Sequence, residues 1–204
     1  MAILPRVPLP NRPDMSPEQR ALYDRIVASP TGGMVGPQRA NIHSPELAEA
    51  WWQLGDMLRN RTILPQALVE LAIIVAGRRW NSQVEFQVHA ARAAQAGIDP
   101  AVIEAIRTGA APEFPDGDAA DVYEFARQVQ MSGNAIDTAY DAVLARWGVR
   151  GVVELTAVIG FYTMVCIALN LHRIPLPDAA QSPLHSLDPA DDLASLSPRR
   201  GHPT

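Results

Sequence analysis

Apolar residues recur with a helical period through most of the chain, and capping residues and glycines divide this pattern into segments. A Ser or Asp, often followed by Pro, precedes most of the apolar stretches, and Gly follows several of them, as is typical of helix starts and ends. The pattern predicts helices over residues 16–29, 44–60, 65–79, 82–97, 99–109, 118–133, 137–148 and 151–171. No segment shows a clear period-two pattern bounded by turn residues, so the expected fold class is all-α.

Proline is concentrated at the two ends of the chain. Five of the 18 prolines fall within residues 1–17, and six fall within residues 175–203. We therefore expect an N-terminal Pro-rich arm over 1–17, a helical domain over 18–174, and a Pro-rich C-terminal tail over 175–204. The tail has few large apolar residues, so burial cannot offset its ordering entropy, and we expect it to be mobile unless a partner subunit holds it.

Two of the predicted helices share a short sequence pattern. Residues 68–71 read LVEL and residues 152–155 read VVEL, and an apolar stretch follows each of them. This similarity predicts a weak internal repeat of two related helical units. Only the first unit, which contains Glu70, is followed by a cluster of polar residues.

Charge and hydropathy exclude several classes of partner. The chain has 17 basic and 22 acidic residues, a net charge of −5, so it lacks the positive excess that binds nucleic acid or an anionic membrane surface. Residues 155–171 form the longest uncharged run, which we interpret as a buried core helix and not as a membrane span. Residues 1–17 lack the unbroken apolar stretch of a secretory signal, so we expect a cytoplasmic protein.

A single cysteine, Cys166, restricts the possible redox chemistry. One thiol cannot form an intramolecular disulfide, a thiolate metal cluster or a Cys-x-x-Cys redox pair. Because Cys166 lies within the apolar run, we expect it to be a small buried hydrophobic residue.

The candidate catalytic residues lie between positions 70 and 89. Glu70 stands among apolar residues on a predicted helix, so its carboxylate is expected to be buried and to need a partner or a proton. Glu85 and His89 are four residues apart on the next predicted helix, and Arg92 extends their row by one turn. Apolar neighbours border this row on both sides, which is typical of a cavity lining that tunes an imidazole and a carboxylate for acid–base catalysis.

Glu85 and Glu70 also have structural interpretations. Ser82 and Glu85 fit a capping box, in which each side chain accepts a hydrogen bond from the other residue's backbone amide. Glu70 could instead bridge helix ends to an arginine, since Glu154 occupies the matching place in the second repeat unit.

The remaining candidates have alternatives of the same kind. Arg92 could be an ion-pair partner instead of a substrate ligand, and Trp80 could anchor the turn after its helix instead of lining a cavity. Glu85 and His89 supply only two metal ligands, and nothing nearby adds a clear third, so no metal site is expected.

The spacing of these residues resembles the carboxymuconolactone decarboxylase and alkylhydroperoxidase D superfamily. In its peroxidase branch the pattern is E-x11-C-x2-C-x3-H, and the corresponding positions here are Glu70, Ser82, Glu85 and His89. Further resemblance comes from Gly36-Pro37, residues 43–47, Arg79-Trp80, Ala94 with Gly97, and residues 103–109. The resemblance covers about residues 18–176 and implies an alkylhydroperoxidase D-like helical bundle that forms a homo-oligomer. Both cysteines of the pattern are replaced, so a thiol peroxidase is not expected.

The decarboxylase branch is more similar, because there a Glu also stands four residues before the His. The resemblance implies a cofactor-free acid–base lyase that acts on a small carboxylated lactone or related organic acid. In this hypothesis Glu85 and His89 are the acid–base pair, and Glu70 sets the protonation and orientation of His89. The expected substrate-binding residues are Trp80, Ser82 and Arg92. Two alternatives remain open: a non-catalytic oligomeric binding protein on the same fold, and a hydratase or isomerase that uses the same pair.

Overall fold

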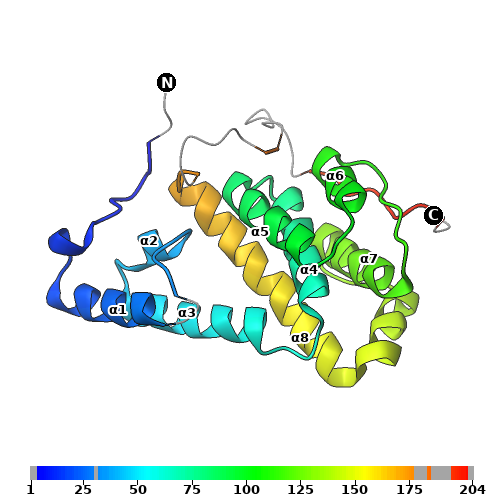
Figure 1. Ribbon diagram of the computed structural model, residues 1–204, viewed down its shortest axis with the longest axis horizontal. Helices are drawn as coiled ribbons and strands as arrows, with labels where there is room; N and C mark the ends of the chain where they lie inside the picture. The colour runs from blue at the N-terminus through cyan, green and yellow to red at the C-terminus, as the bar shows by residue number, and fades with distance from the viewer. Residues whose placement is uncertain (1–3, 30–31, 177–182, 185–193, 202–204) are drawn as a thin grey trace.

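The computed structural model describes residues 4–29, 32–176, 183–184 and 194–201. Within these ranges the chain forms eight α-helices and one short 3-10 helix, and no strand is present, so the all-α prediction is confirmed (Figure 1). In chain order the elements are η1 (Arg12–Asp14), α1 (Pro17–Ala28), α2 (Gln38–Asn41), α3 (Pro45–Asn60), α4 (Gln66–Arg79), α5 (Gln83–Gln95), α6 (Pro100–Thr108), α7 (Gly117–Ser132) and α8 (Asp137–His172).

Several helices begin at the capping residues that the pattern identifies. Ser16 and Gln19 form a capping box at α1, where the Ser16 hydroxyl accepts from the Gln19 amide and the Gln19 side chain accepts from the Ser16 amide. Asp99 and Asp116 accept hydrogen bonds from backbone amides at the starts of α6 and α7. A glycine in the left-handed conformation follows each of these last two helices, where a missing Cβ removes the steric cost.

Helix α8 contains both of the last two predicted helices, joined across a kink at Gly148. The backbone there has φ 65° and ψ −173°, a conformation that residues with a Cβ rarely adopt. By length and composition α8 could cross a membrane, but 56% of its most apolar stretch is buried in the protein, and it packs against α4 and α7. The packing agrees with the interpretation of 155–171 as a core helix.

Helix α4 lies at the centre of the bundle. Each of its residues from Leu68 to Gly77 is buried, and the helix packs against α5, α7 and α8 (Figure 1). Burial on all sides explains why this stretch is apolar throughout instead of on one face. Full burial of a large side chain such as Ile73 contributes about 1.5–3 kcal/mol, so α4 stabilises the fold strongly.

Gly77 determines how closely α4 and α5 approach. A Cβ at this position would lie 3.2 Å from the backbone nitrogen of Phe86 and 3.3 Å from its Cα, a tighter contact than almost all Cβ atoms make. Any larger residue would push α5 away from α4. Since Glu70 lies on α4 and both Glu85 and His89 lie on α5, this close approach brings the three candidates within reach of one another.

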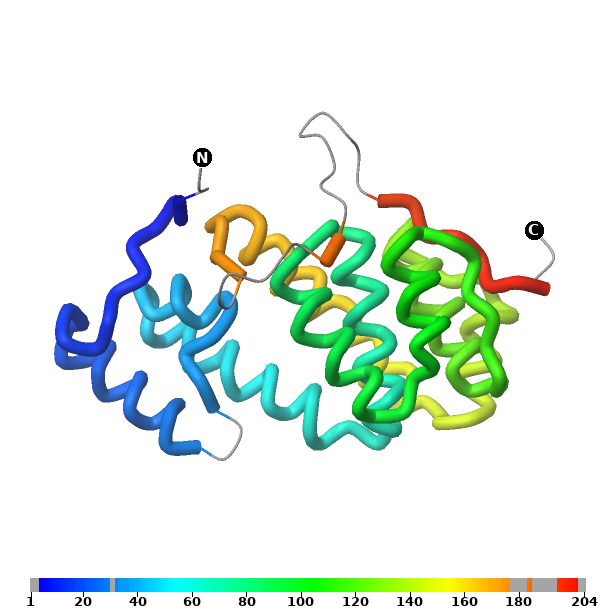
Figure 2. Tube along the Cα trace, turned by 45° about the horizontal axis from the view of Figure 1, so that its top comes forward, coloured from blue at the N-terminus to red at the C-terminus, as the bar shows by residue number. Residues whose placement is uncertain are grey.

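The N-terminal arm lies across the C-terminal end of α8 and the start of α3 (Figure 2). The Arg6 amide donates a hydrogen bond to the His172 carbonyl at 3.0 Å, and the His43 ring nitrogen Nε2 lies 2.8 Å from the Pro8 carbonyl oxygen. The arm is therefore held to the helical domain at two points.

The described residues of the C-terminal tail are anchored on α5, α6 and α7 (Figure 2). The Gln83 side chain exchanges two hydrogen bonds with the backbone of Leu184, and the Tyr123 hydroxyl donates to the Ser197 carbonyl at 2.6 Å. Leu184, Ala194 and Leu196 are buried. The sequence predicts that the tail over 175–204 is mobile unless a partner subunit holds it, whereas Leu184, Ala194 and Leu196 pack against the protein itself. Positions 177–182, 185–193 and 202–204 lie outside the described residues.

Candidate functional site

A cavity of about 840 Å³ lies between α3, α5, α8 and the loop that precedes α2. Four of the sequence-predicted residues line it: Glu70, Glu85, His89 and Arg92. Its walls are aromatic on one side, where α3 and α8 contribute Trp51, Trp52, Phe161 and Tyr162. A cavity of this size, with apolar walls and a few converging polar groups, suits a small organic molecule.

His89 is held between two carboxylates. Its Nδ1 lies 2.6 Å from Glu70 Oε2, and its Nε2 lies 3.1 Å from Glu85 Oε1. All three side chains are buried, and none is more than 7% exposed. The structure therefore brings together the three residues that the sequence proposes as catalytic.

The two contacts of His89 differ in quality. The pair with Glu70 is a well-formed hydrogen bond, and the Gln66 side chain supports it by donating to the other Glu70 oxygen at 2.9 Å. The pair with Glu85 is close but poorly aligned, so Glu85 Oε1 has no hydrogen-bond partner in the part of the chain that the structure describes. Glu70 thus orients the ring, while Nε2 and Glu85 form the end that can exchange a proton with a ligand.

The pKa of His89 is raised above its usual value. Burial opposes the charged imidazolium, but the negative charges of Glu85 and Glu70, with the Glu70 hydrogen bond, together stabilise it more strongly. The ring therefore keeps its proton to a higher pH than an ordinary histidine does, and a protonated ring is the state that a general acid needs.

The structure does not form the capping box that is an alternative role for Glu85. Ser82 is the N-cap residue of α5, but its hydroxyl makes no capping hydrogen bond, and the Glu85 carboxylate lies at His89 instead. Ser82 is fully buried and is not among the residues that line the cavity. Its hydroxyl lies beside the Cys166 thiol, whose pKa burial raises well above the usual range. Ser82 therefore lies outside the cavity lining, where it would not contact a substrate.

Trp80 also lies outside the cavity. Its indole Nε1 donates to the Gln130 side chain at 3.0 Å, and its backbone carbonyl accepts from the Asn170 side chain at 2.7 Å. These contacts tie the end of α4 to α7 and α8, as the alternative interpretation of an anchored turn expects. The substrate-binding role that the sequence suggests for Trp80 has no geometric basis here, because the ring faces another part of the bundle.

Arg92 lines the cavity, as expected from the sequence. Two further arginines, Arg39 and Arg59, were not predicted but also line it. Among the described residues no carboxylate forms an ion pair with any of the three. The ion-pair alternative for Arg92 therefore finds no partner there. One signal could have identified Arg59: Trp51, Gly55 and Arg59 recur every four residues on α3, and all three line the cavity.

Glu154, the repeat counterpart of Glu70, has a structural role. Its carboxylate accepts a hydrogen bond from the Ile63 amide at 2.7 Å and pairs with Arg150 at 2.7 Å. Burial favours its neutral form, but these two partners outweigh burial and lower the pKa of Glu154. The similar LVEL and VVEL segments of α4 and α8 thus carry a glutamate with different contacts in each helix.

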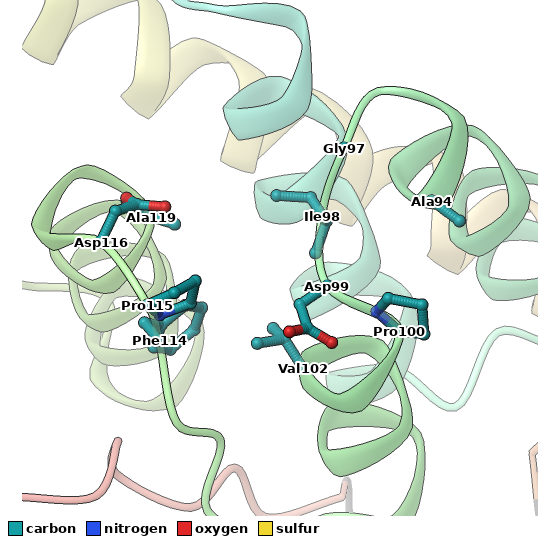
Figure 3. Close-up of a pocket in the computed structure, with 10 residues that line it drawn as sticks. All are labelled: Ala94, Gly97, Ile98, Asp99, Pro100, Val102, Phe114, Pro115, Asp116 and Ala119. Atoms are coloured by element: carbon teal, nitrogen blue, oxygen red, sulfur yellow. The ribbon is translucent and has the colours of Figure 1, made fainter.

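A second hollow, of about 400 Å³, lies where α6 and α7 begin (Figure 3). Asp99 and Asp116 line it, but each carboxylate caps its own helix by accepting from a backbone amide at 2.8 Å. Its described lining contains no His, Cys, Lys or Arg. It offers no acid–base pair, so the larger cavity is the candidate site.

Metal ligation has no support in the described residues, because no group of three or more His, Cys, Asp or Glu side chains there is arranged to hold an ion.

Comparison with known proteins gives matches at the level of structure. No protein-family model matches the sequence, and no curated protein matches it. An alkylhydroperoxidase AhpD core protein of Ralstonia eutropha JMP134, described as an uncharacterized peroxidase-related protein, aligns with a TM-score of 0.70 over 87% of this chain and 95% of its own, at 14% identity. An uncharacterized peroxidase-related protein from Silicibacter sp. TM1040 aligns with a TM-score of 0.70 over 85% of this chain and 92% of its own, at 16% identity.

A third solved structure of this kind has a defined activity in its description. The debrominase Bmp8, solved in complex with 2,3,4-tribromopyrrole, aligns with a TM-score of 0.57 over 84% of this chain and 88% of its own, at 13% identity. Identities this low establish the fold and leave the activity open. The chain has the alkylhydroperoxidase D-like fold, as the resemblance in its sequence implies.

Proposed function

We propose that this protein is a cofactor-free acid–base lyase that acts on a small carboxylated lactone or a related organic acid. One observation carries the proposal: a buried Glu70–His89–Glu85 chain, with contacts of 2.6 and 3.1 Å, lines a cavity of about 840 Å³. Three arginines without a described carboxylate partner line the same cavity, which favours an anionic substrate.

The proposed reaction separates carbon dioxide loss from proton delivery. The bond between the substrate carbon and its carboxylate breaks, and the electron pair delocalises into the adjoining carbonyl group. His89 then gives the proton on Nε2 to that carbon. Glu70 holds the ring and stabilises its charge, while Glu85 passes a proton from solvent back to Nε2. Carbon dioxide leaves, and the consumed proton is replaced by one from water.

The aromatic walls of the cavity support a substrate with a flat ring. Bmp8 is solved with 2,3,4-tribromopyrrole, a planar ring of that class, and it shares the fold. The aromatic residues Trp51 and Phe161, whose ring centroids are 5.4 Å apart, provide apolar walls for a flat ligand. We also propose that the protein works in the cytoplasm as a homo-oligomer.

The test is a screen of carboxylated lactones and β-keto acids for carbon dioxide release and for deuterium uptake at the product carbon. His89→Gln and Glu85→Gln are expected to lose about 100-fold or more of any activity found, as is typical when a general acid or base is removed. Glu154→Gln is the matched control, since it changes another buried glutamate outside the cavity. Full activity in both site variants would contradict the assignment.

A further inference from the structure

The cavity contains two buried polar donors that the acid–base chain does not use. Tyr162 is 2% exposed, and its ring meets His89 edge-on with centroids 5.3 Å apart. Neither the Tyr162 hydroxyl nor the Trp52 Nε1 donates a hydrogen bond to any described residue, although both side chains line the cavity. Buried donors usually have partners in folded proteins, so unpaired ones at a cavity point to a ligand.

Arg59 adds a positive charge beside this hydroxyl. It reaches the cavity from α3, is half-buried, and lies close enough to Tyr162 to act on its ionisation. Arg39 and Arg92 also line the cavity, so the lining contains three arginines and only two carboxylates, those of Glu70 and Glu85. The whole chain has a net charge of −5, and this positive surplus is therefore a local property of the cavity.

The tyrosine is suited to donate a hydrogen bond without losing its proton. Burial raises the pKa of Tyr162 above its usual range; Arg59 acts in the opposite direction, while Glu85 and Glu70 raise the pKa further. The hydroxyl therefore stays protonated beside the charged groups around it, including His89. A neutral donor and a cation next to each other in the lining of one cavity suit a negatively charged oxygen.

We propose that Tyr162 and Arg59 form an oxyanion site that binds the carbonyl oxygen of the substrate as it becomes negatively charged. This inference rests on the proposed function. When the carbon–carboxylate bond breaks, its electron pair forms a carbon–carbon double bond, and the carbonyl π electrons move onto the oxygen. Tyr162 donates a hydrogen bond to this enolate oxygen, Arg59 balances its charge, and His89 later protonates the carbon. The ligand class is a β-keto acid or a lactone with a carboxylate on the carbon next to its carbonyl group.

Binding of 4-nitrophenol tests this site without any turnover. The site should stabilise the phenolate oxygen, so the bound phenol is expected to ionise at a lower pH than the free phenol, which its absorbance reports. Tyr162→Phe should weaken phenolate binding about 10- to 100-fold, the usual range for losing a hydrogen bond to a charged group, and Arg59→Gln should act in the same direction. Because the readout is binding, it can succeed or fail independently of the decarboxylation assay.

A matched control is Tyr123→Phe, which removes another buried tyrosine hydroxyl that hydrogen-bonds to the Ser197 carbonyl outside the cavity. This variant should bind the phenolate like the wild type. Thermal unfolding checks that Tyr162→Phe and Arg59→Gln remain folded, and retention of the phenolate preference by either folded variant would overturn its assigned role. Binding of the neutral phenol alone, or no binding by the wild type, would overturn the oxyanion site.

Discussion

Glu70 Oε2 lies 2.6 Å from His89 Nδ1, and both side chains are almost completely buried although they come from different helices. A carboxylate that is hydrogen-bonded to one ring nitrogen fixes the tautomer and direction of the ring, which leaves Nε2 for chemistry. The same relationship makes the histidine depend on its partner. Its protonation, and through it the stability and proposed activity of the protein, should respond to changes at Glu70.

Glu70→Gln should lower the pKa of His89, because the substitution removes a negative charge and replaces a charge-assisted hydrogen bond with a neutral one. NMR titration of the His89 ring measures this directly. Glu154→Gln, on the repeat counterpart that contacts Ile63 and Arg150, should leave the titration unchanged. An identical His89 titration in the wild type and in Glu70→Gln would show that the hydrogen bond does not control the ring.

The raised pKa of His89 predicts a specific dependence of stability on pH. Its stabilising contribution is fully present below the pKa of an unfolded histidine, about 6.5, and is lost as pH rises through the higher folded value. Urea unfolding of the wild type and His89→Gln between about pH 6 and 9 measures the contribution. The free-energy difference between the two should shrink as pH increases. A difference that stays constant, or that grows with pH, would contradict a raised pKa.

The stability of Ser82→Ala tests whether the Ser82 side chain caps α5 or, as in the structure, makes no capping hydrogen bond. A helix N-cap that loses its side-chain hydrogen bond typically costs about 1 kcal/mol, but here the Ser82 hydroxyl makes no such bond. We therefore expect the free energy of unfolding to change by less than about 0.5 kcal/mol, and the proposed activity to persist, since Ser82 does not line the cavity. Ser16→Ala, which breaks the capping box of α1, is the control that should be measurably less stable.

A homo-oligomer is expected to use the exposed face of α8. Val149, Val153, Met164, Ile167 and Leu171 are large apolar residues with 41–69% exposure that recur along this helix at helical spacing. Val153→Glu combined with Ile167→Glu should convert the assembly to monomers, because burying unpaired carboxylates in an interface is costly. Light scattering on the eluting protein measures the mass. A wild type that elutes as a monomer would exclude the oligomer, and an unchanged mass in the double variant would place the interface elsewhere.

The helices could be predicted well because their signals are local. The capping residues and the apolar period locate α1 and α3 to α7 to within a few residues, and Gly148 marks the kink within α8. The short elements η1 and α2 were not predicted, because three or four residues are too few to show a helical period.

The site was predictable only where helical spacing determines it. Glu85 and His89 share a face of one helix, and the spacing pattern adds Glu70 on the preceding helix. Arg59 and Tyr162 could not be assigned from spacing to these residues, because they come from α3 and α8, which meet the other two helices only through tertiary packing. Trp80 and Ser82 show the reverse: they are close to the site in sequence, but packing places both side chains outside the cavity lining.

The central claim is that the buried Glu70–His89–Glu85 chain transfers a proton to carbon. The most direct measurement is carbon dioxide release and deuterium uptake by the wild type and by His89→Gln, on a carboxylated lactone or β-keto acid that the wild type turns over. His89→Gln is expected to lose about 100-fold or more of the wild-type rate while remaining folded. A folded His89→Gln protein with the wild-type rate and deuterium uptake would contradict it.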